Sequence, residues 1–216
     1  MTPFVILFFL HNVLATILLG FQFGSKQEPV FKYFGFGLLL DSVAFAIWSA
    51  AVIFKPADLE TFVMIGALFF IASLVAFFAA AIQHVSPKKR NRMLIAASVL
   101  GVAAFLTRTL VYMGNPGFSA EGLFFFNLHP VMQVVYVFAL ALAVLPAIDA
   151  VATRIKDPVF SNLVRYGFII EVIGGIMLMM STDLLVLTLS GCLISFTYFA
   201  LWMMSFGRAK AWKEVV

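Results

Sequence analysis

Long apolar runs recur along this chain, and they decide what it can fold into. A helix that crosses the hydrocarbon core of a bilayer needs roughly 20 mostly apolar residues. The runs are continuous and do not alternate between apolar and polar residues, as the strands of a spanning β-barrel do. The sequence therefore predicts an all-α polytopic membrane protein with seven transmembrane helices. The predicted helices cover residues 3–24, 31–54, 59–83, 93–113, 123–148, 159–180 and 184–206.

The composition agrees with this class and limits the number of domains. Hydrophobic residues make up 63% of the 216 residues and charged residues 11%, against about 45–50% and about 25% in soluble domains. A short chain cannot hide that much apolar surface from water. The loops are too short for a separate soluble catalytic or nucleic-acid-binding domain. We expect a single membrane domain that comprises a three-helix unit (1–85), a linking helix (86–117), a second three-helix unit (118–210) and a tail (211–216).

The basic residues predict how the helices are oriented. Loops rich in Lys and Arg stay in the cytoplasm. With seven spans, Lys55 and Arg108 fall on one side and the other twelve basic residues on the opposite side. This bias predicts that the N-terminus lies on the outer side of the membrane and the C-terminus in the cytoplasm. The expected location of the protein is the cytoplasmic or plasma membrane. The twelve are Lys26, Lys32, Lys88, Lys89, Arg90, Arg92, Arg154, Lys156, Arg165, Arg208, Lys210 and Lys213.

The densest group of cations suggests a partner. Lys88, Lys89, Arg90 and Arg92 lie together at the predicted cytoplasmic face, where such clusters attract anionic lipid headgroups. We therefore expect the lipid bilayer, and not nucleic acid, as the partner of these residues. The sequence is also compatible with a homo-oligomer or with membership of a larger membrane complex.

The first and last three predicted helices share short patterns in the same order, which indicates an internal duplication. His11 corresponds to His129, and Asp41 corresponds to Glu171. The Lys-Gln-Glu-Pro-Val-Phe segment before the second helix resembles the Lys-Asp-Pro-Val-Phe segment before the sixth. Two three-helix units joined by one helix cross the membrane in the same direction, which predicts parallel repeats about an axis along the membrane normal.

This three-one-three arrangement resembles the SWEET and PQ-loop group of small seven-helix transporters. The resemblance covers the whole chain as architecture and implies a transporter with an outside N-terminus. The Pro-Gln dipeptides of that group are absent, since Phe4 follows Pro3 and Val131 follows Pro130, so no site residues are carried over. A retinal protein is excluded, because no lysine occurs between Lys156 and Lys210 to form the Schiff base.

Two acids near the middle of predicted helices are the leading candidates for a site. Asp41 lies about ten residues into the second helix and Glu171 about twelve into the sixth. A charge at the bilayer centre costs several kcal/mol, and such residues usually face the interior of the bundle. Asp41 and Glu171 would form a central site that binds a cation or carries a proton. The alternative is two neutral carboxyl groups that hydrogen-bond to neighbouring helices.

Further polar residues extend this candidate site towards the outer face. His11 and His129 fall in the outer third of the first and fifth predicted helices, and His129, Gln133 and Tyr136 share one helical face. The histidines either line a pore, bind haem or a metal, or form hydrogen bonds inside the bundle. No third ligand stands at metal-like spacing beside either histidine, so we predict neither a metal site nor a cofactor.

Two other features have structural as well as functional interpretations. Arg108 extends to the interface, pairs with Asp58, Glu60, Glu121 or Asp183, or binds an anionic ligand. Gly20 and Gly24 have the spacing of small residues that let two helices pack closely.

Together these features favour a small-solute or ion facilitator with a central site between the two three-helix units. The alternative is a non-transporting membrane sensor or an accessory subunit of a larger membrane complex. Hydrolase and phosphate-binding signatures are absent from the sequence, so we do not expect an enzyme.

Overall fold

A computed structural model describes residues 3–54, 58–120 and 124–207, and the described chain is almost entirely helical. The all-α class is therefore confirmed. Seven α-helices, a 3₁₀ turn and two short strands follow one another in this order: α1 Pro3–Gly24, α2 Pro29–Phe54, α3 Leu59–Ala81, η1 Ile82–His84, α4 Pro87–Leu110, β1 Gly117–Phe118, β2 Phe124–Phe125, α5 Pro130–Ala152, α6 Pro158–Met180 and α7 Leu184–Gly207.

Five of the described helices are long and apolar enough to cross a membrane, namely α2 to α6. Shorter apolar helical stretches within α1 and α7 run over Leu10–Gly24 and Leu185–Leu201. The chain is thus a membrane-embedded helical protein.

Prolines and polar caps determine where several helices begin. Pro87, Pro130 and Pro158 stand in the first turn of their helices, where the missing N–H would have no intrahelical partner. Asp58 accepts the N–H of Thr61 at the start of α3. A side chain that accepts a first-turn N–H in this way stabilises the start of a helix.

The start of the fifth helix differs from the prediction. The sequence predicted a helix from residue 123, but the chain pairs Phe118 with Phe124 in an antiparallel two-stranded ribbon, and α5 begins only at Pro130. Asn127 has a φ of 43°, a left-handed conformation that interrupts a right-handed helix and that Asn adopts more readily than most residues. The apolar run alone could not reveal this break.

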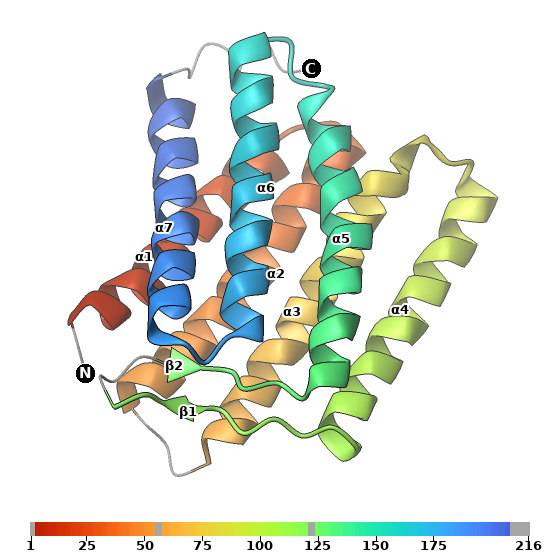
Figure 1. Cartoon of the computed structure of the whole chain (residues 1–216). Coiled ribbons are helices and arrows are strands. Elements are labelled where there is room, and N and C mark those ends of the chain that lie inside the picture. The colour runs from red at the N-terminus through yellow and green to blue at the C-terminus, as the bar shows by residue number, and fades with distance from the viewer. Residues whose placement is uncertain (1–2, 55–57, 121–123, 208–216) are drawn as a thin grey trace.

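The helices form two groups that meet face to face. In Figure 1, α5, α6 and α7 stand in front of α1, α2 and α3. Within each group the consecutive helices pack on one another, and the groups join where α1 contacts α7 and where α3 contacts α5. The six helices therefore enclose a common interior.

Aromatic rings fill the middle of this interior. The ring of Phe34 on α2 meets the ring of Phe168 on α6 edge to face, with centroids 5.1 Å apart. Phe34 also contacts Phe77 of α3 at 5.1 Å. Such pairs add about 0.5–1.5 kcal/mol beyond the burial of their area, and the Phe34–Phe168 pair joins the two groups.

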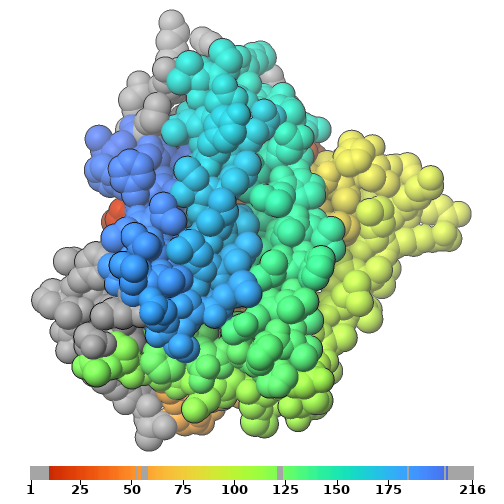
Figure 2. All heavy atoms as spheres, in the orientation of Figure 1, coloured from red at the N-terminus to blue at the C-terminus, as the bar shows by residue number. Residues whose placement is uncertain are grey.

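Helix α4 stands apart from the other six. It packs mainly on α3 and protrudes at the right of Figures 1 and 2. Ile95 and Leu100 on α4 are 66% and 70% exposed. Lipid tails are as apolar as these side chains, so such exposure carries no hydrophobic penalty in a bilayer.

The close packing predicted at Gly20 and Gly24 is confirmed. Gly35 of α2 lies directly against both glycines of α1. A Cβ atom added at Gly35 would meet the backbone N of Gly24 and would lie 2.6 Å from the carbonyl oxygen of Gly20. Neither helix could keep its position if Gly35 carried a side chain.

We predict that Gly35→Ala lowers the free energy of unfolding by about 1–3 kcal/mol, the usual effect of overpacking, as measured by SDS-induced unfolding in mixed micelles. Gly24→Ala is the matched control, since a Cβ there has no neighbour within 4 Å. Equal losses in the two variants would contradict the close contact.

Candidate functional site

The bundle brings Asp41 and Glu171 to one cavity, although 130 residues separate them in the chain. Asp41 is buried and Glu171 is half-buried. The cavity measures about 20 Å³, which is room for about one water molecule. Apart from the two acids, its lining consists of Phe34, Leu38, Phe70, Leu74, Phe77, Leu140, Val144, Phe168 and Tyr198. We call it the inner cavity.

The two acids have different partners. The hydroxyl of Tyr198 on α7 donates to Oε1 of Glu171 over 3.3 Å. The Oδ1 atom of Asp41 is buried without a hydrogen-bond partner among the described residues. A buried oxygen without a partner is unfavourable by about 1–3 kcal/mol. Asp41 therefore has an open position for a donor or a cation in the inner cavity.

Tyr198 belongs to a polar stripe on the last helix together with Thr188 and Ser195. From the sequence, the hydroxyls of this stripe either line a polar path or bond to backbone oxygens one turn back. Spacing on a single helix could not show that Tyr198 faces an acid on α6.

The two histidines lie away from the inner cavity, and they do not meet each other. His11 donates from Nε2 to the backbone oxygen of Ser195 over 3.1 Å, so it links α1 to α7. His129 is exposed and caps α5, where its Nδ1 accepts the N–H of Val131. Its ring stacks on Tyr112 with centroids 4.5 Å apart. The predicted place of His129 within the outer third of a helix is wrong, because Pro130 starts that helix.

Gln133 and Tyr136 are not among the residues that line the inner cavity. Gln133 donates to the backbone oxygen of Leu128 over 3.1 Å and so ties the preceding loop to α5. Tyr136 is buried, but it lines a second cavity rather than the inner one. Among the described residues, no group of three or more His, Cys, Asp or Glu side chains is placed to hold a metal ion.

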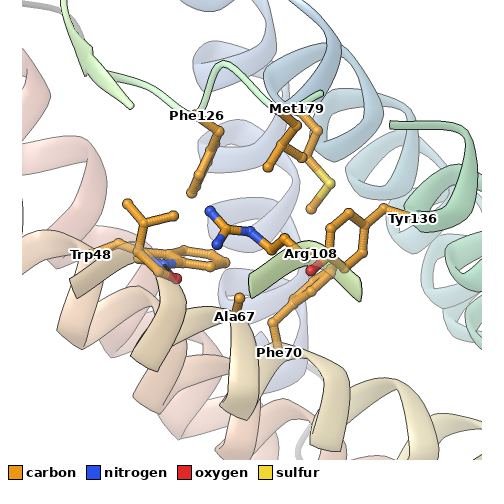
Figure 3. Close-up of a pocket in the computed structure, with 9 residues that line it drawn as sticks. Trp48, Ala67, Phe70, Arg108, Phe126, Tyr136 and Met179 are labelled. Atoms are coloured by element: carbon orange, nitrogen blue, oxygen red, sulfur yellow. Dashed lines mark hydrogen bonds between the residues drawn. The ribbon is translucent and has the colours of Figure 1, made fainter. Parts of the chain in front are cut away.

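The second cavity, which we call the outer cavity, surrounds the side chain of Arg108 (Figure 3). It also measures about 20 Å³. Aromatic and aliphatic side chains from four helices and the loop after β2 enclose the guanidinium group. The lining residues are Trp48, Val63, Ala67, Phe70, Arg108, Phe126, Leu128, Tyr136 and Met179.

Arg108 forms an ion pair instead of extending to the interface. It is fully buried, and its Nη1 atom lies 2.7 Å from Oε1 of Glu60, whose side chain is 23% exposed. Of the acids that the sequence offered, Asp58 bonds to Thr61 and Asp183 bonds to the first turn of α7. Glu121 lies outside the described residues. Arg108 is the only wholly buried charged residue at this end of the described bundle. The carboxylate of Glu60 partly balances its charge.

Phe70 lines both cavities. It stands on α3 between Ala67 in the outer cavity and Leu74 in the inner one, and its ring lies 6.1 Å from that of Tyr136. An aromatic side chain therefore stands between the two small cavities.

Neither a protein-family model nor a curated protein sequence matches the chain.

We predict that Glu60→Leu lowers the free energy of unfolding by about 3–5 kcal/mol, because it leaves the buried Arg108 charge without its partner. The double variant Glu60→Leu with Arg108→Met should recover most of this loss. SDS titration in mixed micelles measures all three proteins.

The control is Asp149→Leu, which breaks the ion pair of Arg165 with the 64% exposed Asp149. An exposed pair contributes at most about 1 kcal/mol. A loss at Glu60 no larger than the loss at Asp149 would refute the importance of burial here.

Proposed function

We propose that this chain is an ion facilitator of the membrane that carries protons through a central site formed by Asp41 and Glu171. The observation that carries the proposal is the shared inner cavity, in which two acids from α2 and α6 face one small space. Ionisable groups inside a bundle are typical of ion and proton pathways.

The size and chemistry of the inner cavity favour a proton over a larger solute. Its volume of about 20 Å³ accommodates about one water molecule. The unpartnered Oδ1 of Asp41 accepts a proton, and the Tyr198 hydroxyl supports the charge on Glu171. A proton can pass between the two carboxyl groups through a single bridging water, and no wide channel is needed.

The contacts between helices support seven spans in two parallel repeats. In two parallel repeats, a rotation puts α1 in the place of α5 and α3 in the place of α7. The same rotation turns the α1–α7 contact into the α3–α5 contact, and the protein has both contacts. The same rotation would relate α2, which carries Asp41, to α6, which carries Glu171.

An ion pair between loops supports the same orientation. Glu28, before α2, lies 3.0 Å from Arg154, which follows α5. These loops occupy corresponding places in the two units, and parallel repeats put them on one face of the membrane. With the basic residues, this face is the cytoplasmic one.

A second candidate, an accessory subunit of a larger membrane complex, is favoured by the surface of α4. An apolar groove of about 590 Å³ runs between α2, α3 and α4, lined among others by Phe36, Ile71 and Phe105. A helix of a partner would fit such a groove. Extraction in a mild detergent distinguishes the two, since an accessory subunit remains in a large complex and a facilitator does not.

We predict that the wild-type protein in liposomes acidifies an internal pH-sensitive dye when a potassium diffusion potential drives protons inward. The double variant Asp41→Asn with Glu171→Gln should reduce the rate at least tenfold, because neither amide carries the proton. Asp149→Asn makes the same chemical change at an exposed acid and should leave the rate unchanged. Equal rates in the wild type and the double variant would rule the proposal out.

Phe70 provides a second test of the pathway. Phe70→Ala should raise the proton flux several-fold, because it removes the ring that separates the inner and outer cavities and admits water between them. Phe69→Ala, a half-buried neighbour on the same helix, is the control. If Phe70→Ala leaves the flux at the wild-type rate, protons do not pass this point.

A further inference from the structure

The guanidinium group of Arg108 presents one complete edge without a partner. Its Nη1 atom is bound to Glu60, whereas Nε and Nη2 have no hydrogen-bond partner among the described residues. These two nitrogens lie on the same side of the planar group and donate in parallel. Together they form an edge of the rigid guanidinium group that can donate to two oxygens at once.

A further donor lines the same space. The hydroxyl of Tyr136 is buried and has no hydrogen-bond partner among the described residues. It lines the outer cavity together with Arg108 (Figure 3). An arginine edge and a phenol in one cavity offer three donors, and no described residue accepts from them.

The remaining lining is apolar and determines the size of an occupant. Trp48, Phe126 and Met179 surround the guanidinium group (Figure 3). The volume of about 20 Å³ holds about one water molecule, so an occupant of three non-hydrogen atoms fits only when the flexible Met179 side chain moves outward. Where water is largely excluded, charge-assisted hydrogen bonds are roughly twice as strong as neutral ones.

Backbone from two loop segments lies near the free edge. A methyl group at Gly114 would lie 3.4 Å from Nη2 of Arg108 and equally close to the carbonyl oxygens of Phe126 and Asn127. The Nη2 atom therefore lies beside Gly114, in the segment between α4 and β1, at the place where this segment approaches the chain before α5. Glu60 is partly exposed beside it, so the opposing carboxylate stays in contact with solvent while the arginine edge faces inward.

We propose that the outer cavity binds a small planar oxyanion of the monocarboxylate class, of which formate is the smallest member. The two oxygens accept from Nε and Nη2 of Arg108, and one of them also accepts from the Tyr136 hydroxyl. Glu60 holds the other end of the guanidinium group and fixes the direction of the free edge. This proposal rests on the residues of the outer cavity alone and not on proton transport, since Asp41 and Glu171 line the other cavity.

Trp48 lines the outer cavity and reports directly on its occupant. The chain has three tryptophans, so Trp202→Phe with Trp212→Phe leaves Trp48 as the sole emitter. The full chain in this background is titrated in detergent with sodium formate, and separately with sodium chloride at matched ionic strength. We expect a saturable change of Trp48 fluorescence with formate, at a concentration at least tenfold below any response to chloride.

Tyr136→Phe should weaken formate binding about tenfold, the effect of losing one hydrogen bond to a charged group. Tyr166→Phe, at a tyrosine that is 60% exposed, is the matched control and should bind as the parent does. Arg108→Lys should abolish the saturable change, because an ammonium group has no fork. If Arg108→Lys does not fold, the formate affinity of Tyr136→Phe tests the proposal.

Three results would overturn the proposal. The first is a Trp48 signal that does not saturate with formate. The second is equal affinity for chloride and formate, which would make the cavity a halide site. The third is unchanged formate affinity in Tyr136→Phe.

Discussion

Every polar group within this bundle needs a partner inside the protein, because the bilayer offers none. An unpaired polar group in hydrocarbon costs several kcal/mol. The fully buried Arg108 therefore has Glu60 within 2.7 Å, and Glu171 has Tyr198. Apolar residues such as Leu100 and Phe196 occupy the surface instead. Asp41 and Arg108, the charged residues that are buried in the described bundle, therefore lie in its interior and do not face lipid.

The same constraint explains how much of the fold could be read from the sequence. The apolar runs gave the helices, since their length reflects the thickness of the membrane. They also placed Asp41 and Glu171 at similar depths in the membrane. Because a charge that faces lipid is unfavourable, both side chains were expected to point into the bundle. Depth and direction together imply proximity, and the two acids do line one cavity. Their binding role remains a proposal.

Other features depended on contacts that spacing along one helix does not contain. The segment before α5 is as apolar as a span, yet it forms a ribbon and a turn at Asn127, and this removed His129 from the helix. Tyr136 shares a face with Gln133 in the sequence pattern, but Gln133 bonds to the backbone of the same segment while Tyr136 turns towards Arg108. The choice of Glu60 among four candidate acids was likewise decided by the packing of α3 against α4.

The edge-to-face contact of Phe34 with Phe168 has a mechanical consequence. It joins α2 to α6 at 5.1 Å, in the lining of the cavity that holds the two acids. A change in how these two rings pack moves α2 relative to α6, and the inner cavity that both helices line changes shape with them. The spacing of Asp41 and Glu171 therefore depends in part on a contact between two uncharged rings.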